Sequence, residues 1–159
     1  MSPPLGSTRF AGDQSKYPGM RAAEVLVWRE FLKANGASYD RFDYNTRLGP
    51  GVTPPDNIIE PYRSASIAAS KLRSDIIGWR GGVPTIFEVE RYAKPDAIGQ
   101  ILGYRALWEN AGGSAVSPVL ALVCGDYNPH IMPALTEHGI DLYVFPVDFN
   151  QLAPARLRS

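Results

Sequence analysis

The chain has only one cysteine, Cys124, among its 159 residues, so no internal disulfide can form. It also has no run of about 18 consecutive apolar residues, the length that a transmembrane helix needs. The N-terminal sequence lacks the basic-then-apolar order of a signal peptide. Cys124 itself lies in an apolar stretch. We therefore expect a buried thiol in a protein of the reducing cytoplasm, without membrane association.

Net charge is also lacking, because the 16 basic and 16 acidic residues cancel. The protein as a whole is therefore not expected to attract nucleic acid electrostatically. No Lys or Arg occurs between Arg105 and Arg156, whereas basic residues are frequent in the middle of the chain. The middle group is Arg63, Lys71, Arg73, Arg80, Arg91, Lys94 and Arg105. Two interpretations remain open: a single face that binds a phosphate backbone, or separate solvated charges.

The length of the chain predicts one domain. Residues 1–18 are rich in Pro, Gly and Ser, which indicates a flexible or partner-dependent arm. The predicted domain spans residues 19–149, and residues 150–159 form a C-terminal tail.

Hydrophobic periodicity predicts an α/β fold with a mixed central sheet flanked by helices. A helix is expected over residues 19–34, a strand over 38–51 and a Pro-rich loop over 50–61. Strands 74–80 and 84–91 flank Gly81-Gly82, which predicts a hairpin. A helix over 96–110, a buried strand over 117–126, a short helix over 128–139 and a strand over 140–147 follow. The order is thus αβββαβαβ, with a parallel pair at the end.

Three acidic residues stand out on the predicted hairpin. Glu88 and Glu90 lie two residues apart on one strand and therefore share a side. Asp75, on the neighbouring strand, is placed to meet Glu88 across the hairpin. Three converging carboxylates raise one another's pKa, and a hard divalent cation such as Mg²⁺ or Mn²⁺ removes that conflict. The alternative is an exposed acidic strand face.

The stretch from Arg73 to Trp108 resembles a known family in three motifs: R-S-D-I-I-G-W-R, P-T-I-F-E-V-E-R and A-I-G-Q-I-L-G-Y-R. Together they resemble the core of the PD-(D/E)XK nuclease superfamily. The resemblance is greatest to its RecB-like branch and to phage or mobile-element relatives with a downstream Q-x-x-x-Y motif. It implies a restriction-endonuclease-like fold and metal-dependent hydrolysis of DNA.

By this resemblance, Asp75 is the metal-binding Asp and Glu88 the acidic residue of the family's E-x-K motif. Glu90 stands where Lys is usual, as a third ligand or a general base. Gln100 and Tyr104 match Q-x-x-x-Y and contact DNA near the metal. Lys94 is the candidate for the missing positive charge, with an ordinary loop lysine as the alternative.

Family members often bring a further carboxylate from the first helix to the metal. Glu24 is the candidate here, Glu30 is a second one, and simple surface exposure is the other interpretation. The residues expected to touch phosphates are Arg73, Arg91, Lys94 and Arg105.

The rival hypothesis is a nuclease fold without catalysis, serving as a nucleic-acid-binding or structural subunit of a virus or mobile element. Glu90 in place of Lys, the zero net charge and the N-terminal arm all favour it. Such an arm orders against a partner or a second copy of the chain, so a homo-oligomer or assembly partner is expected under this hypothesis. An unrelated α/β domain with an acidic sheet edge is a third interpretation.

Overall fold

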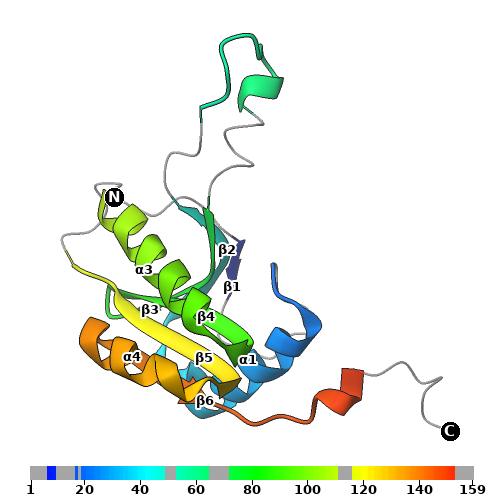
Figure 1. Ribbon diagram of the computed structural model, residues 1–159, viewed down its shortest axis with the longest axis vertical. Coiled ribbons are helices and arrows are strands. Elements are labelled where there is room, and N and C mark those ends of the chain that lie inside the picture. The colour runs from blue at the N-terminus through cyan, green and yellow to red at the C-terminus, as the bar shows by residue number, and fades with distance from the viewer. Residues whose placement is uncertain are drawn as a thin grey trace, which may run out of the picture.

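The computed structural model describes residues 7–9, 17, 19–48, 53–64, 72–110 and 116–152. Within its strands, the side chains of residues 7–9, 47 and 72–75 are outside the description. The fold is α/β, with a mixed sheet covered by helices on both faces (Figure 1). The predicted fold class is therefore confirmed at this level.

In the described part of the chain six strands form one sheet, and strands that are neighbours along the chain are also neighbours in the sheet. They are β1 (Ser7–Arg9), β2 (Arg41–Leu48), β3 (Leu72–Arg80), β4 (Val83–Ala93), β5 (Val119–Tyr127) and β6 (Ile140–Val144). From β1 to β4, each strand pairs antiparallel with the next one. β4 pairs parallel with β5, and β5 pairs parallel with β6. The hairpin predicted at Gly81-Gly82 is confirmed, and both glycines have the positive φ, 54° and 79°, that a tight hairpin turn requires.

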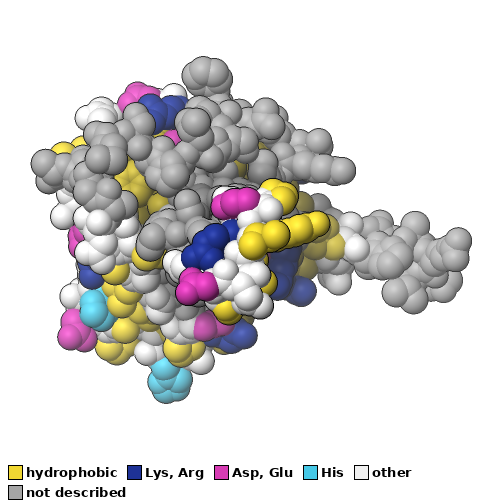
Figure 2. Space-filling view, turned by 90° about the horizontal axis from the view of Figure 1, so that it is seen from above, with side chains coloured by type: hydrophobic (Ala, Val, Ile, Leu, Met, Phe, Trp, Pro, Cys, Tyr) yellow, Lys and Arg dark blue, Asp and Glu magenta, His cyan; other side chains and the backbone are white. Residues whose placement is uncertain are grey.

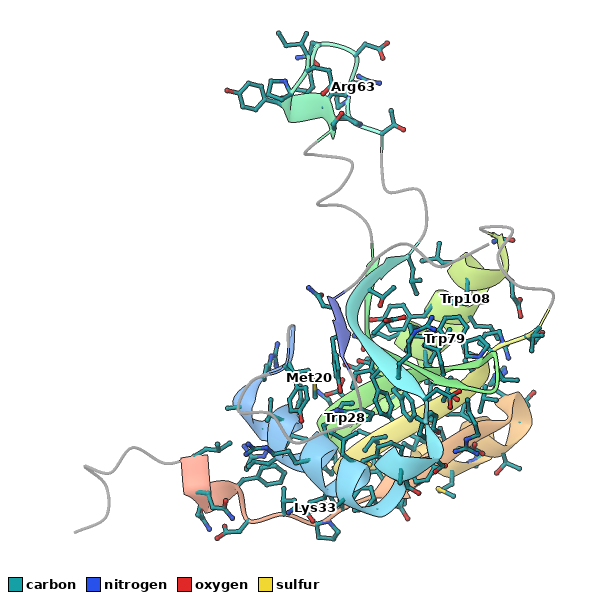
Figure 3. All side chains as sticks on the ribbon, turned by 180° about the vertical axis from the view of Figure 1, so that it is seen from behind. Met20, Trp28, Lys33, Arg63, Trp79 and Trp108 are labelled. Atoms are coloured by element: carbon teal, nitrogen blue, oxygen red, sulfur yellow. The ribbon has the colours of Figure 1, made fainter. Side chains whose placement is uncertain are left out.

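Within the described ranges, the longer helices that flank the sheet are α1 (Ala22–Asn35), α3 (Pro95–Asn110) and α4 (Met132–His138). Short 3₁₀ helices are η1 (Gly36–Ser38), η2 (Pro129–Ile131) and η3 (Phe149–Leu152). α3 and α4 cover one face of the sheet, and α1 covers the other (Figures 1 and 3). None of the helices in the described ranges has the length and apolar composition needed to cross a membrane.

β1 lies within the segment predicted to be an arm. It pairs with β2 so that Thr8 is opposite Asp43. Tyr17, further along this segment, is buried, and its ring centroid lies 5.2 Å from that of Tyr44 on β2. The remaining residues of 1–18 lie outside the described part of the chain.

An aromatic cluster joins α1 to the sheet. Trp28 and Phe31 of α1 stack on each other, and the Phe87 ring of β4 meets both at centroid distances of 5.2 and 5.1 Å. The indole N–H of Trp28 donates a hydrogen bond to the Tyr44 hydroxyl at 3.2 Å. Because this polar group is satisfied, the aromatic rings can be buried without the cost of an unpaired donor.

An aliphatic layer fills the space on the opposite face, beneath α3 and α4. Its largest fully buried side chains include Ile77, Ile86, Ile101, Leu122 and Ile131, and the aromatic residues Tyr104 and Trp108 pack in the same layer. Cys124 belongs to this layer and is fully buried, as predicted. Burial, with the negative charges of Asp126 and Glu90, raises the pKa of the Cys124 thiol to about 12. The thiol is therefore protonated at neutral pH and has the chemistry of a small core residue.

Gly78 of β3 lies under the aromatic cluster. A Cβ atom at this position would lie 2.8 Å from Phe87 Cε2 and 3.0 Å from Phe42 Cε1 and Tyr39 Cδ1. Gly78→Ala is therefore expected to lower the free energy of unfolding by about 1–3 kcal/mol through overpacking. The change is measured by urea denaturation followed by circular dichroism.

The matched control is Gly99→Ala on α3, where an added Cβ meets nothing within 4 Å. This substitution is expected to raise stability by about 0.5–1 kcal/mol, because Gly is unfavourable inside a helix. Equal effects of the two substitutions would contradict the packing that we describe.

Candidate functional site

Asp75 and Glu88 occupy neighbouring positions on adjacent strands. The register pairs Ile76 with Phe87, and Asp75 precedes Ile76 whereas Glu88 follows Phe87. Beside these positions, Ser74 of β3 still pairs with β2, and Glu88 of β4 still pairs with β5. The description covers the backbone of Asp75 but not its side chain.

Glu88 lies in the aliphatic layer on the α3 side of the sheet. Ile86, two residues earlier on β4, and Leu122, its partner on β5, both belong to this layer. Glu88 is only 5% exposed. Because an ionised carboxylate is costly to bury unless positive charge or hydrogen bonds compensate it, Glu88 is an unusual residue for a core layer.

Glu90 lies further along β4 and is half-buried. Burial raises the pKa of its carboxyl above 4.5, and the negative charges of Glu24 and Asp96 raise it further. The positive charges of Arg21 and Lys94 act in the opposite direction. Charges from α1, from the β4–α3 connection and from the first turn of α3 therefore meet around Glu90.

Glu24, predicted to come from the first helix, is among these charges. Its carboxylate also accepts a hydrogen bond of 2.8 Å from the backbone N–H of Arg21, which caps the start of α1. Glu30, the second candidate on this helix, instead forms an exposed ion pair of 2.8 Å with Lys33. The structure thus brings Glu24 into the electrostatic field of Glu90, whereas Glu30 has a local partner.

The donor chemistry at this end of the sheet suits a hard divalent cation, because it consists of carboxylates. Among the side chains that the structure describes, no group of three or more His, Cys, Asp or Glu is arranged to hold a metal ion. Asp75 is the fourth predicted ligand beside Glu24, Glu88 and Glu90. Its side chain is not described, so the absence of such a group does not extend to Asp75. Carboxylates are the type of ligand that such a cation prefers. Among the described side chains, however, no three of them converge on one point.

Gln100 and Tyr104 both lie on α3, one turn apart, as predicted. Their environments differ, since Gln100 is exposed and Tyr104 is buried in the aliphatic layer at 8% exposure. Tyr104 therefore shares its layer with Glu88, while the amide of Gln100 is accessible from solvent.

The basic residues have separate local surroundings in the described part of the chain. The guanidinium of Arg91 lies over the Phe149 ring at 4.4 Å, and that of Arg80 lies over Tyr39 at 4.6 Å. Lys94 is exposed and Arg105 is half-buried. The side chain of Arg73 lies outside the description, and so does Lys71. Of the two interpretations of the central basic residues, the described ones favour separate charges over one basic face.

Two acidic residues in this structure were not candidates from the sequence. Asp96 raises the pKa of Glu90 from the first turn of α3, and no local pattern in the sequence marked it as a site residue. Asp43 is a buried carboxylate on β2 that accepts a 2.8 Å hydrogen bond from the indole N–H of Trp79. Asp43 lies in a strand that alternates polar and aromatic residues, and this pattern predicts that the polar side chains are exposed. The sequence therefore did not indicate that Asp43 is buried.

Comparison of this chain with protein-family models, with curated proteins and with solved structures found no match. The chemistry of the site therefore has to be inferred from its own residues. The strongest evidence among them is the placement of Asp75, Glu88 and Glu90 on two adjacent strands.

The raised pKa of Glu90 predicts a pH-dependent stability difference for Glu90→Gln. Between 4.5 and the higher native pKa, the native state binds more protons than the unfolded state, so wild-type stability falls as pH rises through this window. The neutral amide of Gln does not have this penalty. We expect Glu90→Gln to melt at a higher temperature than wild type at about pH 7 and to lose that advantage at about pH 4.

The measurement is thermal unfolding in EDTA, so that no bound cation contributes. Glu137→Gln, which changes an exposed carboxylate of α4, is the matched control. A Glu90→Gln advantage that is the same at both pH values would contradict the assigned environment of Glu90.

Proposed function

We propose that this protein is a metal-dependent nuclease with a restriction-endonuclease-like fold of the PD-(D/E)XK type. The observation on which the proposal rests is the β3–β4 register, which puts Asp75 and Glu88 at neighbouring positions. α3 packs against this part of the sheet and presents Gln100 and Tyr104. The acidic residues lie on β3 and β4, and the Q-x-x-x-Y residues lie on α3, which packs against these strands. This arrangement supports the proposal, because the family uses the two motifs together.

The order of elements supports the same proposal. After β1, the chain forms a helix, three antiparallel strands, a helix, a strand, a helix and a final strand. A mixed sheet with this order matches what the resemblance implies. Many folds share mixed sheets, so the acidic residues and not the fold support the activity.

Under this proposal, Asp75 and Glu88 hold Mg²⁺ or Mn²⁺, Glu24 is a further ligand, and Glu90 is either a third ligand or the general base. The cation, when bound, polarises a phosphodiester and lowers the pKa of a water molecule that attacks phosphorus. The burial of Glu88 fixes its carboxylate in the sheet, which limits the movement of a ligand during hydrolysis.

Glu90 has the environment of a proton acceptor. Its pKa lies above that of an ordinary glutamate because of burial and because of the charges of Glu24 and Asp96. A general base works best when its pKa approaches the working pH. The positive charge of Lys94 lowers the pKa of the same carboxyl, and in this proposal Lys94 supplies the charge of the family's usual Lys.

DNA is the proposed substrate, and α3 is the element that contacts it. The exposed amide of Gln100 can donate to a phosphate or a base, whereas buried Tyr104 supports the helix from the core side. Arg105 lies on the same helix, and Arg73 lies on β3 beside the acidic positions. Arg91 contributes from the opposite side of β4, where it stacks on Phe149.

A second function is a nuclease fold that binds DNA or builds an assembly without cleaving it, and one specific observation favours the assembly role over DNA binding. The described basic side chains are dispersed, with Arg80 and Arg91 over separate rings. A protein that engages a long stretch of phosphate backbone usually gathers such charges.

Cleavage of supercoiled plasmid and of single-stranded DNA tests the proposal. Wild-type protein with Mg²⁺ or Mn²⁺ is expected to cut, and EDTA is expected to stop it. Asp75→Ala and Glu88→Gln should abolish cutting because they remove proposed ligands. Glu90→Gln should slow it by about 10²–10⁴-fold if Glu90 is the base.

Glu137→Gln, on the exposed surface of α4, serves as the matched control and should cut like wild type. Unchanged cutting by folded Asp75→Ala and Glu88→Gln would refute the assignment of the site. The absence of cutting by folded wild type with either metal would favour the second function.

Metal binding can be measured independently of catalysis. At a concentration of about 100 times its Kd, Mn²⁺ should raise the melting temperature of the wild type by about 5–10 °C, because it binds only the native state. Glu88→Gln should lose most of this shift, and Glu137→Gln should retain it. A melting temperature of the wild type that does not respond to Mn²⁺ would indicate a relic site.

A further inference from the structure

Residues 53–64, which we call the knob, lie apart from the layered body of the domain (Figure 1). They fall in the region predicted to be a Pro-rich loop, yet they are locally organised. Arg63 Nη1 donates hydrogen bonds to the carbonyl oxygens of Pro55 and Ile58 at 3.3 and 3.5 Å. The Ser64 hydroxyl donates to Glu60 Oε1 at 2.8 Å. The knob is therefore held by its own contacts.

The knob exposes more apolar side chain than any other part of the described chain. Ile59 and Tyr62 are each 72% exposed, whereas the other exposed large hydrophobic residues do not exceed 44%. Seen from above, hydrophobic side chains project beside charged ones (Figure 2). Two large apolar side chains held in one small structure are typical of an interaction surface.

The charge of the knob indicates what kind of partner it suits. Its charged residues are Asp56, Glu60 and Arg63. The guanidinium of Arg63 is turned towards the knob's own carbonyl groups and lies 3.9 Å from Asp56, whose side chain is fully exposed. The outer surface is therefore acidic and apolar, which disfavours a phosphate backbone and favours an apolar surface with a basic rim.

The body of the domain contains a surface of that kind, which we call the α1 groove. It is an open cavity of about 420 Å³, lined by Tyr17, Met20, Ala22, Val25, Leu26, Arg29 and Leu152. Among the described residues that line it, Arg29 is the only charged one, and the exposed Arg21 lies at the N-terminus of the same helix. The floor is apolar, so the groove is complementary to the knob in both polarity and charge.

We propose that the knob of one copy of this chain docks into the α1 groove of a second copy. Ile59 and Tyr62 would enter the apolar part of the groove, while Asp56 and Glu60 face Arg21 and Arg29. The inference is independent of the proposed nuclease activity, because none of these residues is assigned a catalytic role.

The two surfaces lie apart in the structure, and we therefore assign the contact to two separate chains. Arg63 marks the knob at one end of the molecule, and Met20 marks the groove on the body beside α1 (Figure 3). Because the two surfaces are different, the contact is head-to-tail, and such contacts build rings or open chains of subunits. A contact built on two anchoring side chains is expected to be of micromolar strength, since small interfaces are weak.

Sedimentation velocity over a range of protein concentrations tests the proposal. The wild type is expected to associate. Two variants, Ile59→Ser/Tyr62→Ser in the knob and Leu26→Gln in the groove, should each weaken association by about tenfold or more. The control is Tyr92→Ser/Val144→Ser, which removes two exposed hydrophobic residues elsewhere and should associate like wild type.

Mixing the two variants gives the decisive result. The knob variant retains an intact groove and the groove variant retains an intact knob, so the mixture should form a one-to-one complex although each alone is monomeric. If Leu26→Gln fails to fold, as judged by circular dichroism, Met20→Gln replaces it in the same experiment.

Association that survives in the knob variant, or a mixture that stays monomeric, would overturn the proposal. A monomeric wild type at every concentration would also overturn it, and the groove would then be left to the chain's own C-terminal residues or to another protein.

Discussion

The packing of Phe87 against α1 fixes which face of the sheet each side chain of β4 occupies, and the candidate site depends on that constraint. The Phe87 ring packs in an edge-on arrangement against Trp28 and Phe31 of α1, within the range of spacings that aromatic pairs prefer. Because a strand alternates its side chains, fixing Phe87 on the α1 side places Glu88 on the α3 side. The same contact therefore stabilises one layer and orients a carboxylate into the other.

Burial favours the protonated form of both a carboxyl and a thiol on this face of the sheet. It makes Glu90 costly to ionise, so this residue gains from a nearby cation or from a proton. It makes Cys124, opposite Glu90 on β5, a protonated and unreactive thiol. A carboxylate in this position suits function because its charge state depends on what binds nearby, whereas the thiol beside it suits only packing.

The order of elements could be predicted from the sequence because each element has a local pattern. The hairpin follows from Gly81-Gly82, and β5 follows from its continuous apolar run. β1 could not be predicted in this way, because its pairing with β2 joins residues far apart in a Pro- and Gly-rich context. The predicted start of the first helix differs from the start of α1 at Ala22 for a similar reason, since Gly19 has a positive φ of 80° that no helix accommodates.

The candidate site was predictable to a smaller extent. Alternation alone gave the shared side of Glu88 and Glu90, but it could not indicate that Asp96 and Glu24 act on Glu90 from two different helices. It also could not indicate that Asp43 is buried, because the hydrogen bond from Trp79 joins residues 36 positions apart. Interactions of this kind follow from packing between elements, which a local pattern does not contain.

The solitary buried thiol has a practical consequence for labelling chemistry. Since Cys124 is the only cysteine of the chain and its pKa is about 12, the folded protein offers almost no thiolate to a maleimide at neutral pH. A cysteine introduced at an exposed position would then be the single reactive thiol of the folded molecule. Spectroscopic probes could be attached there without replacing Cys124 and without disturbing the aliphatic layer that it fills.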